Sequence, residues 1–397
     1  MSGDMVYIWD EELRFYDFGP GHPLSPIRNV LAYKLTDYLG VLARPNVTLT
    51  EHVEPATDDQ LAWVHEVPYI DSVRRASDGT GYRDLARGLG SDDVPIFAGM
   101  HQAAARVCGA TISAVRAVQS GAALHAVNIS GGLHHAMPGS ASGFCIYNDP
   151  AVGIEWLLRN SFERIAYVDV DVHHGDGVQE AFYNDPRVLT VSIHESGRYL
   201  FPGTGRPDEV GGPDARGSAV NIALPSGVDD NGWLRAFDAI VPKVLRAFQP
   251  QILVTQQGCD SHRNDPLANL NLTVDGQRAS YLRLHELAHE LCGGRWVALG
   301  GGGYDWLDAV PRAWTHLAAI AAGKAIDVST ETPMAYRSLL QTAFGVEAPA
   351  TMGDGALINP HPWSAGYDML DPLDRAVLKT EDAVYPEMGL VADPYMF

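Results

Sequence analysis

The most constraining feature of the chain is the segment 168–177, which reads Val-Asp-Val-Asp-Val-His-His-Gly-Asp-Gly. In a strand successive side chains point to opposite faces, so Asp169, Asp171 and His173 project together while the valines pack behind them. Two carboxylates and an imidazole are costly to bury without compensation, and a divalent cation commonly supplies it. The alternative is a turn at the strand end whose backbone satisfies these side chains. The density of ligand-type residues favours a metal site.

Composition narrows the class of protein. The 397 residues are 46% hydrophobic and 19% charged, as in an ordinary globular protein, and suffice for one large α/β domain or two smaller ones. The net charge of −21 argues against a nucleic-acid partner, because phosphate binding needs clustered Lys and Arg. The same charge would favour a cationic substrate.

The expected location is the cytoplasm. The chain has four cysteines, which lie far apart and form no Cys-x-x-Cys pair, as is typical of a reduced protein: Cys108, Cys145, Cys259 and Cys292. The first residues lack the basic leader and apolar core of a signal peptide. No membrane span is expected, since no apolar run reaches about 18 residues.

Short apolar runs alternate with longer segments of helical period. The expected strands are 124–130, 164–172, 188–194, 219–224, 251–256 and 295–299. The expected helices are 98–120, 148–159, 229–248, 274–293 and 305–323. Apolar strands separated by helices predict a mostly parallel sheet covered on both faces. Ligands of such sheets bind beyond the carboxyl ends of the strands, where the motifs below are found.

We expect a single domain over residues 1–325, because no repeat or low-complexity linker interrupts it. Residues 326–397 contain seven prolines and show weak periodicity, apart from possible helices near 334–344 and 371–380. We expect this C-terminal extension to pack on the domain.

Two histidines follow the first expected strand, in the Gly-Gly-Leu-His-His-Ala-Met-Pro segment 131–138. The glycines permit turns that other residues resist, so His134 and His135 can both reach one cavity. A lone histidine is more often structural, but an adjacent pair after a buried strand favours a function. Asp169 and Asp176 are candidate partners that would fix the imidazole tautomers and raise their basicity.

Two further motifs follow strands 251–256 and 295–299. In Gln-Gln-Gly-Cys-Asp-Ser-His (256–262), Asp260 is a candidate oxygen ligand, although alone such a residue is more often a cap. In Gly-Gly-Gly-Gly-Tyr (300–304), the glycines let the backbone approach a site and Tyr304 can aim its hydroxyl at developing negative charge. Alone, that segment would be a glycine turn with a packed tyrosine. The prediction rests on the four motifs together.

Residues 285–289, His-Glu-Leu-Ala-His, match the His-Glu-x-x-His pattern of zinc metalloproteases. The surrounding segment is typical of an amphipathic helix between two strands, and no suitably placed Glu or His follows within 25 residues. We therefore interpret His285 and His289 as part of a helix face.

Together the motifs resemble the zinc-dependent histone deacetylase superfamily, and more closely its bacterial acetoin-utilisation (AcuC-type) deacetylases, over roughly residues 5–320. The family's order is kept by Gly-Gly-Leu-His-His-Ala, Ala-Ser-Gly-Phe-Cys-Ile-Tyr-Asn-Asp (141–149), Asp-Val-Asp-Val-His-His-Gly-Asp-Gly, Phe-Pro-Gly-Thr-Gly (201–205) and Gly-Gly-Gly-Gly-Tyr. The AcuC-type placement rests on Gly-Cys-Asp-Ser-His followed by Asp-Pro-Leu-Ala (265–268), and on Cys-Gly-Gly-Arg-Trp before the glycine loop. Cys259 departs from the eukaryotic branch, where alanine is usual, but leaves the neighbouring ligand intact.

The resemblance implies an arginase/deacetylase-like α/β domain that binds one Zn²⁺ through Asp171, His173 and Asp260. Two oxygens and one nitrogen form a relatively hard site, so Fe²⁺ is a credible substitute. The metal would activate a water and polarise the acyl oxygen.

Catalytic roles follow from the same resemblance. His135, paired with Asp176, would take the proton of the water and return it to the amine. His134, paired with Asp169, would assist electrostatically, and Tyr304 would donate to the oxyanion.

The resemblance also assigns substrate and cation positions. Gly143, Phe144 and Phe201 match residues that line a narrow acyl-lysine tunnel, and Asp93, or else its neighbour Asp92, matches a carboxylate that holds the substrate backbone. A K⁺ ion behind the zinc would use Asp169, Asp171, His173, Ser192 and Ile193, and a second would use Phe182, Asp185 and Val188.

The implied activity is removal of acetyl groups from lysines of cytoplasmic proteins, with acetyl-CoA synthetase as a natural target. A small-molecule deacetylase, such as an acetylpolyamine amidohydrolase, is the alternative. A two-manganese arginase-like ureohydrolase would need further ligands that the chain lacks. A non-catalytic acyl-lysine binding module would not need His134, His135 and Tyr304. The oligomeric state is left open.

Overall fold

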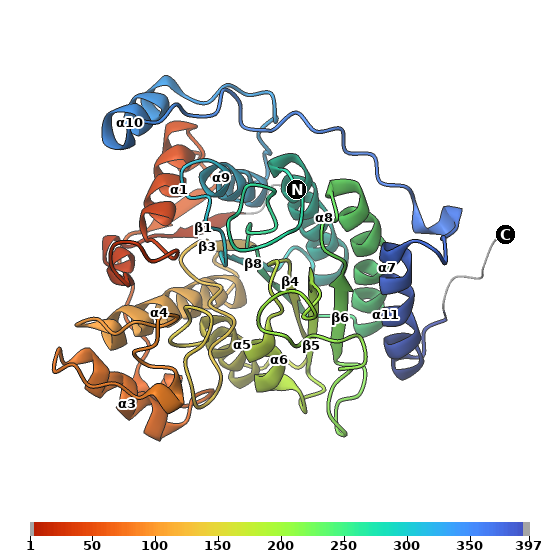
Figure 1. Cartoon of the computed structure of the whole chain (residues 1–397), viewed down its shortest axis with the longest axis horizontal. Helices are drawn as coiled ribbons and strands as arrows, with labels where there is room; N and C mark the ends of the chain where they lie inside the picture. The colour runs from red at the N-terminus through yellow and green to blue at the C-terminus, as the bar shows by residue number, and fades with distance from the viewer. Residues whose placement is uncertain (1–3, 392–397) are drawn as a thin grey trace.

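The computed structural model describes residues 4–391, so residues 1–3 and 392–397 of the expected domain and extension lie outside it. Its centre is an eight-stranded sheet of order β2-β1-β3-β8-β7-β4-β5-β6 (Figure 1). The strands are β1 (Met5–Ile8), β2 (Val47–Thr50), β3 (His125–Asn128), β4 (Ile165–Asp169), β5 (Val188–Glu195), β6 (Ala219–Leu224), β7 (Ile252–Gln256) and β8 (Trp296–Leu299). Neighbouring strands are parallel throughout. The predicted parallel α/β sheet is confirmed.

The helices are α1 (Ile27–Tyr38), α2 (Asp58–Leu61), α3 (Val67–Ser77), α4 (Met100–Gln119), α5 (Asp149–Arg159), α6 (Asp176–Phe182), α7 (Asp230–Phe248), α8 (Val274–Cys292), α9 (Ala309–Ala321), α10 (Met334–Phe344) and α11 (Pro372–Met388). The described residues also form three short 3₁₀ helices, at Glu11–Phe15, Leu85–Arg87 and Trp363–Ala365. No helix within residues 4–391 is both long and apolar enough to cross a membrane.

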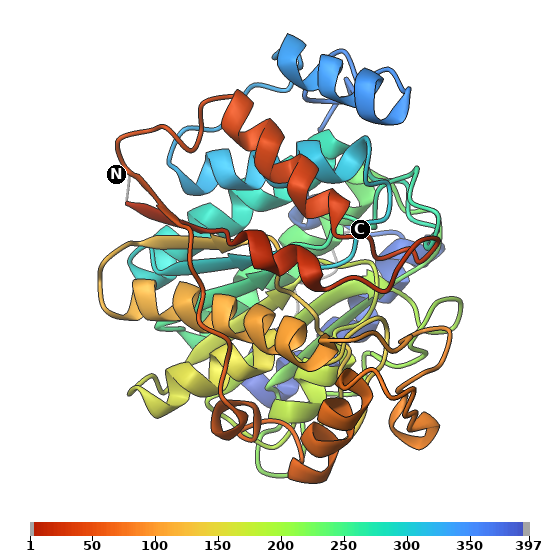
Figure 2. The same cartoon turned by 90° about the vertical axis from the view of Figure 1, so that its left-hand side faces the viewer.

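The helices cover both faces of the sheet, and Figure 2 shows α4 on one face with α1 and α9 on the other. Alternate residues of β4 enter different cores: Ala166 and Val168 pack with α7, α8 and α9, whereas Ile165 and Tyr167 pack with α4 and α5. Because both faces of each central strand are buried, the strands are apolar throughout rather than alternating.

The strand that carries the first motif is shorter than predicted. The sequence predicts a strand over 164–172, but β4 ends at Asp169, and Asp171 and His173 lie in the following turn. The carboxylates of Asp169 and Asp171 each accept the backbone N–H two residues further on, at 3.2 and 3.0 Å. Such aspartate turns compete with strand pairing and end the strand here.

The C-terminal extension contacts the sheet edge and two helices. In it, α10 packs near α1, and α11 packs against α7 and against β6, the last strand of the sheet. Thr380 of α11 donates to the Asn221 carbonyl of β6 at 2.7 Å, and the Arg235 guanidinium of α7 forms two 2.9 Å hydrogen bonds with the Asp374 carboxylate. This arrangement covers an otherwise open strand edge.

We expect Asp374→Ala to lower the free energy of unfolding by about 3 kcal/mol, because it leaves the buried Arg235 without its counter-charge. Urea denaturation followed by circular dichroism measures the change. The exposed Arg246–Glu290 pair provides a matched control, and Glu290→Ala should change stability by about 1 kcal/mol or less. Equal effects of the two substitutions would contradict a structural role for the buried pair.

Candidate active site

The motif residues of the sequence converge at the carboxyl ends of four adjacent strands, β3, β8, β7 and β4. His134 and His135 follow β3, Asp171 and His173 follow β4, and the remaining two strands contribute Asp260 and Tyr304. Parallel strands bring all these loops to one edge of the sheet.

Asp171, His173 and Asp260 form a compact buried cluster. The Nδ1 atom of His173 lies 3.1 Å from Oδ1 of Asp171 and 3.0 Å from Oδ2 of Asp260. Their candidate ligand atoms lie within 4.8 Å of one another. Two buried carboxylates directed at one imidazole require a positive charge between them. The donor set therefore fits a divalent cation that accepts oxygen and nitrogen ligands.

The second oxygen of each carboxylate is anchored by the protein. Oδ2 of Asp171 accepts hydrogen bonds from the Gln256 amide and the Gly302 backbone N–H, both at 2.7 Å. Oδ1 of Asp260 accepts from the Val172 backbone N–H at 2.9 Å. These bonds leave one oxygen of each carboxylate directed toward His173, as expected of oriented metal ligands.

The glycines of the neighbouring loops are needed for this close approach. A β-carbon at Gly302 would collide with the Asp260 carboxylate, and one at Gly258 would collide with Asp171. Gly301 also has a backbone φ of +148°, which L side chains rarely adopt. The glycine run thus lets the loop after β8 approach the acidic cluster.

Each of the paired histidines is hydrogen-bonded to its own carboxylate. Nδ1 of His134 lies 2.7 Å from Asp169, and Nδ1 of His135 lies 2.7 Å from Asp176. The two Nε2 atoms are 3.0 Å apart. A carboxylate can only accept here, so both Nδ1 atoms carry protons and the Nε2 atoms are left for chemistry.

The two imidazoles differ in charge. Burial lowers the pKa of His134, but the charges of Asp169 and Asp171 outweigh it and raise that pKa to about 9. Burial and the adjacent His134 charge lower the pKa of His135 to about 4. At neutral pH His135 is therefore the neutral imidazole, the form that can accept a proton.

Tyr304 lines the same narrow pocket as His134, His135 and His173. Burial and the charges of Asp260 and Asp171 raise the pKa of its hydroxyl well above the usual value. The hydroxyl keeps its proton and is available as a hydrogen-bond donor. The Tyr304 backbone N–H donates to Asp265 at 2.7 Å, which holds this end of the glycine loop.

Two of the three predicted tunnel residues line this pocket. Gly143 and Phe144 line it, and the Phe144 ring meets the Tyr304 ring edge-on at 5.7 Å. Phe201 is 45% exposed and does not line the pocket, but its ring lies 5.0 Å from that of His135. The Asp93 carboxylate accepts the Gly143 N–H at 2.8 Å, whereas Asp92 is exposed.

The predicted potassium positions fall in two places. Asp169 and Ser192 are paired across β4 and β5, next to Ile193, Asp171 and His173. Phe182, Asp185 and Val188 form a turn between α6 and β5, with Asp185 N–H donating to the Phe182 carbonyl and Val188 N–H to the Asp185 carbonyl. The Asp185 carboxylate is engaged by Arg187.

Sequence reasoning missed two positioning residues. Gln256 donates to Asp171, and Asp149 accepts the backbone N–H groups of Gly132 and Leu133 at 3.0 and 2.8 Å, which holds the histidine loop. Both residues occur within the motifs quoted above. A polar residue at the end of an otherwise apolar strand was the available signal for Gln256.

Comparison with known proteins agrees with the geometry. The histone deacetylase domain matches residues 22–321. Acetoin utilization protein AcuC of Bacillus subtilis (strain 168) is 40% identical over 359 residues, which cover 90% of this chain and 92% of that protein. The protein of the same name in Staphylococcus aureus (strain MSSA476) is 36% identical over 320 residues, covering 80% and 81%.

Solved structures agree as well. The crystal structure of an HDAC homologue complexed with SAHA superposes with a TM-score of 0.79 at 29% identity, covering 96% of this chain and 99% of that chain. An HDAC homologue from Aquifex aeolicus gives a TM-score of 0.80 at 29% identity, covering 95% and 100%. The matched domain and the extent of these relatives show that the chain belongs to the histone deacetylase family, in its acetoin-utilisation (AcuC-type) branch.

Proposed function

We propose that this deacetylase removes acetyl, or related acyl, groups from lysine side chains of cytoplasmic proteins. The observation that carries the proposal is a buried cluster of metal-ligand type beside two carboxylate-paired histidines in one narrow pocket. Asp171, His173 and Asp260 would hold Zn²⁺, or Fe²⁺ as its substitute.

The proposed chemistry divides among the pocket residues. A bound cation would lower the pKa of a water and polarise the acyl carbonyl. His135, oriented by Asp176, accepts the proton of the attacking water at Nε2 and then delivers it to the departing lysine amine. His134, held in its charged form by Asp169, stabilises the developing negative charge.

Recognition would use the walls of the pocket. Phe144 and Phe201 would enclose the apolar stem of the acylated lysine, and Gly143 would leave room between them. Asp93, already fixed by the Gly143 N–H, would hold the substrate backbone. We also propose K⁺ at the two groups of positions described above, where its role would be structural.

A panel of acetylated substrates tests the proposed class. An acetyl-lysine peptide should be hydrolysed with a higher kcat/KM than N-acetylputrescine, and acetylated acetyl-CoA synthetase is the protein to test first. The net charge of −21 favours cationic substrates and keeps the acetylated polyamines as the alternative. Preference for N-acetylputrescine over every peptide would replace the proposal by that alternative.

Tyr304→Phe removes only a hydroxyl, so folding and metal content should be retained. Loss of one donor to the tetrahedral oxyanion costs on the order of 3 kcal/mol, or about a hundredfold or more in rate. We expect kcat for an acetyl-lysine peptide to fall by that amount with little change in peptide binding. Unchanged turnover would show that Tyr304 takes no part in the reaction. A loss of turnover that is explained by unfolding would also count against the assigned role.

A further inference from the structure

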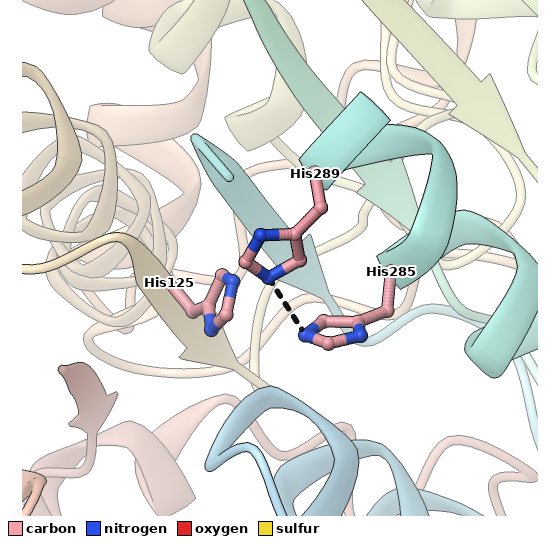
Figure 3. Close-up of side chains that lie close together, drawn as sticks. All are labelled: His125, His285 and His289. Carbon is pink, nitrogen blue, oxygen red and sulfur yellow. Dashed lines mark hydrogen bonds between the residues drawn. The ribbon is translucent and has the colours of Figure 1, made fainter. Parts of the chain in front are cut away.

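Three histidines meet near the amino ends of the strands, whereas the active site lies at the carboxyl ends. His125 is the first residue of β3, and His285 and His289 lie one turn apart on α8. Figure 3 shows the His125 ring facing the other two rings across the gap between strand and helix. The sequence interpretation of His285 and His289 as a helix face did not include this third residue.

The spacing of the three rings suits a common ligand. One nitrogen from each ring lies within 4.8 Å of the others, and the Nε2 atoms of His285 and His289 are 3.2 Å apart. The centroid of the His125 ring lies 5.0 Å from that of His285 and 5.1 Å from that of His289. Tetrahedral zinc with Zn–N bonds of about 2.0–2.1 Å places its nitrogens roughly 3.3 Å apart, so the nitrogens would have to approach one another by at most about 1.5 Å.

His125 has the hydrogen-bond arrangement of a metal ligand. Its Nδ1 lies 2.6 Å from the Ala321 carbonyl oxygen, and a carbonyl can only accept, so Nδ1 carries the proton. Its Nε2 lone pair is buried and has no hydrogen-bond partner among the described residues. A ligating histidine characteristically donates its other N–H to a backbone carbonyl in this way. The unpartnered Nε2 atom is therefore an independent indication that this site binds a ligand.

The charge state of the cluster also suits a metal. Burial lowers the pKa of His125 to about 4, and burial together with the neighbouring histidines lowers that of His285 to about 4. Burial lowers the pKa of His289 as well. Neutral imidazoles can bind a metal ion without losing a proton to solvent. A tautomer shift in one of the two rings would break the hydrogen bond between His285 and His289.

The neighbouring residues leave space for the three histidine rings, and the Glu of the His-Glu-x-x-His segment points away from them. A β-carbon at Gly294 would press on the His289 ring at 3.0 Å. Glu286, the general base of a metalloprotease motif, instead lines a groove between α7 and α8 with Asp238 and Glu290. The geometry is that of a binding site without the protease base.

We propose that His125, His285 and His289 bind a second transition-metal ion, which fastens α8 to the start of β3. Three imidazole nitrogens suit Zn²⁺, Ni²⁺ or Cu²⁺ and disfavour Mg²⁺ and Ca²⁺. His285 and His289 are only partly buried, so water can supply a remaining ligand.

Zinc binding by the full-length chain tests the site. After chelator treatment, equilibrium dialysis with Zn²⁺ and elemental analysis should give two equivalents for the unaltered protein. The double variant His285→Gln/His289→Gln should bind one equivalent and keep its deacetylase kcat/KM. Asp260→Ala should bind one equivalent of Zn²⁺. Adding His289→Gln to this variant should weaken the affinity for that Zn²⁺ by more than about 100-fold, because loss of an outer-sphere partner alone costs about 10–100-fold.

Matched variants separate site loss from misfolding. His52→Gln alters an exposed histidine elsewhere and should keep both equivalents. Zinc should raise the Tm of Asp260→Ala but not that of Asp260→Ala/His289→Gln, with both folded by circular dichroism. One equivalent in the unaltered protein, or two in the double variant, would overturn the proposal whatever the deacetylase activity.

Discussion

Asp260→Ala should lose the metal ion of the active site and reduce deacetylase turnover to background. The substitution removes one of three protein ligands and leaves Asp171 and His173 to hold a weakly bound, open ion. It also removes the acceptor of the Val172 N–H, so the turn after β4 loses an anchor. Elemental analysis of the purified protein, together with kcat/KM on an acetyl-lysine peptide, measures both effects.

His285→Ala serves as the control for this substitution. It lies at the other edge of the sheet, so it should leave the active-site ion and kcat/KM unchanged. An active-site ion retained in full by Asp260→Ala would refute the proposed ligand set. Loss of activity in His285→Ala would instead link the helix histidines to catalysis.

His135→Ala should fold and bind metal yet lose roughly 10²–10⁴-fold in kcat, the usual contribution of a general acid–base group. His135 is the buried imidazole that stays neutral at neutral pH, and its Nδ1 is already fixed by Asp176. Steady-state kinetics on an acetyl-lysine peptide, with metal content measured in parallel, isolates the chemical step.

Asp176→Asn provides a graded comparison, because it keeps the imidazole but removes the carboxylate that orients it. Its loss in kcat should be smaller than that of His135→Ala. Near-normal turnover by His135→Ala would show that another group carries the proton.

The strands and helices that the sequence predicts are those with a strong apolar signal. The expected strands correspond to β3 through β8, and the expected helices to α4, α5, α7, α8, α9 and α10, with 371–380 covering only the first part of α11. The sequence missed β1 and β2. β2 is a half-exposed edge strand in which apolar and polar residues alternate, so it lacks the continuous apolar run of the predicted strands. It also missed α1, α2, α3 and α6. Of these, α6 begins inside the Asp169–Asp176 motif, where loop signals dominate.

The site was predictable because its residues cluster after strands, and parallel strands end at one edge. The pairing of His134 with Asp169 and of His135 with Asp176 was predicted, but other contacts between motifs depend on the packing of side chains and were not. Gln256 reaches Asp171 only once β7 and β4 lie side by side. His125 carried no signal as a single histidine at a strand start, and only the fold brings it to His285 and His289. Phe144 adopts a φ of +65°, a conformation that the sequence around it does not predict.

The central claim is that this pocket hydrolyses acyl-lysine with water. Its most direct test is mass spectrometry of the acetate released from an acetyl-lysine peptide by the zinc-loaded full-length chain in ¹⁸O-labelled water. The account predicts acetate that carries one labelled oxygen and a free-lysine peptide in equal amount, with neither formed by Asp260→Ala. Absence of labelled acetate, or equal release by the unaltered protein and Asp260→Ala, would contradict it.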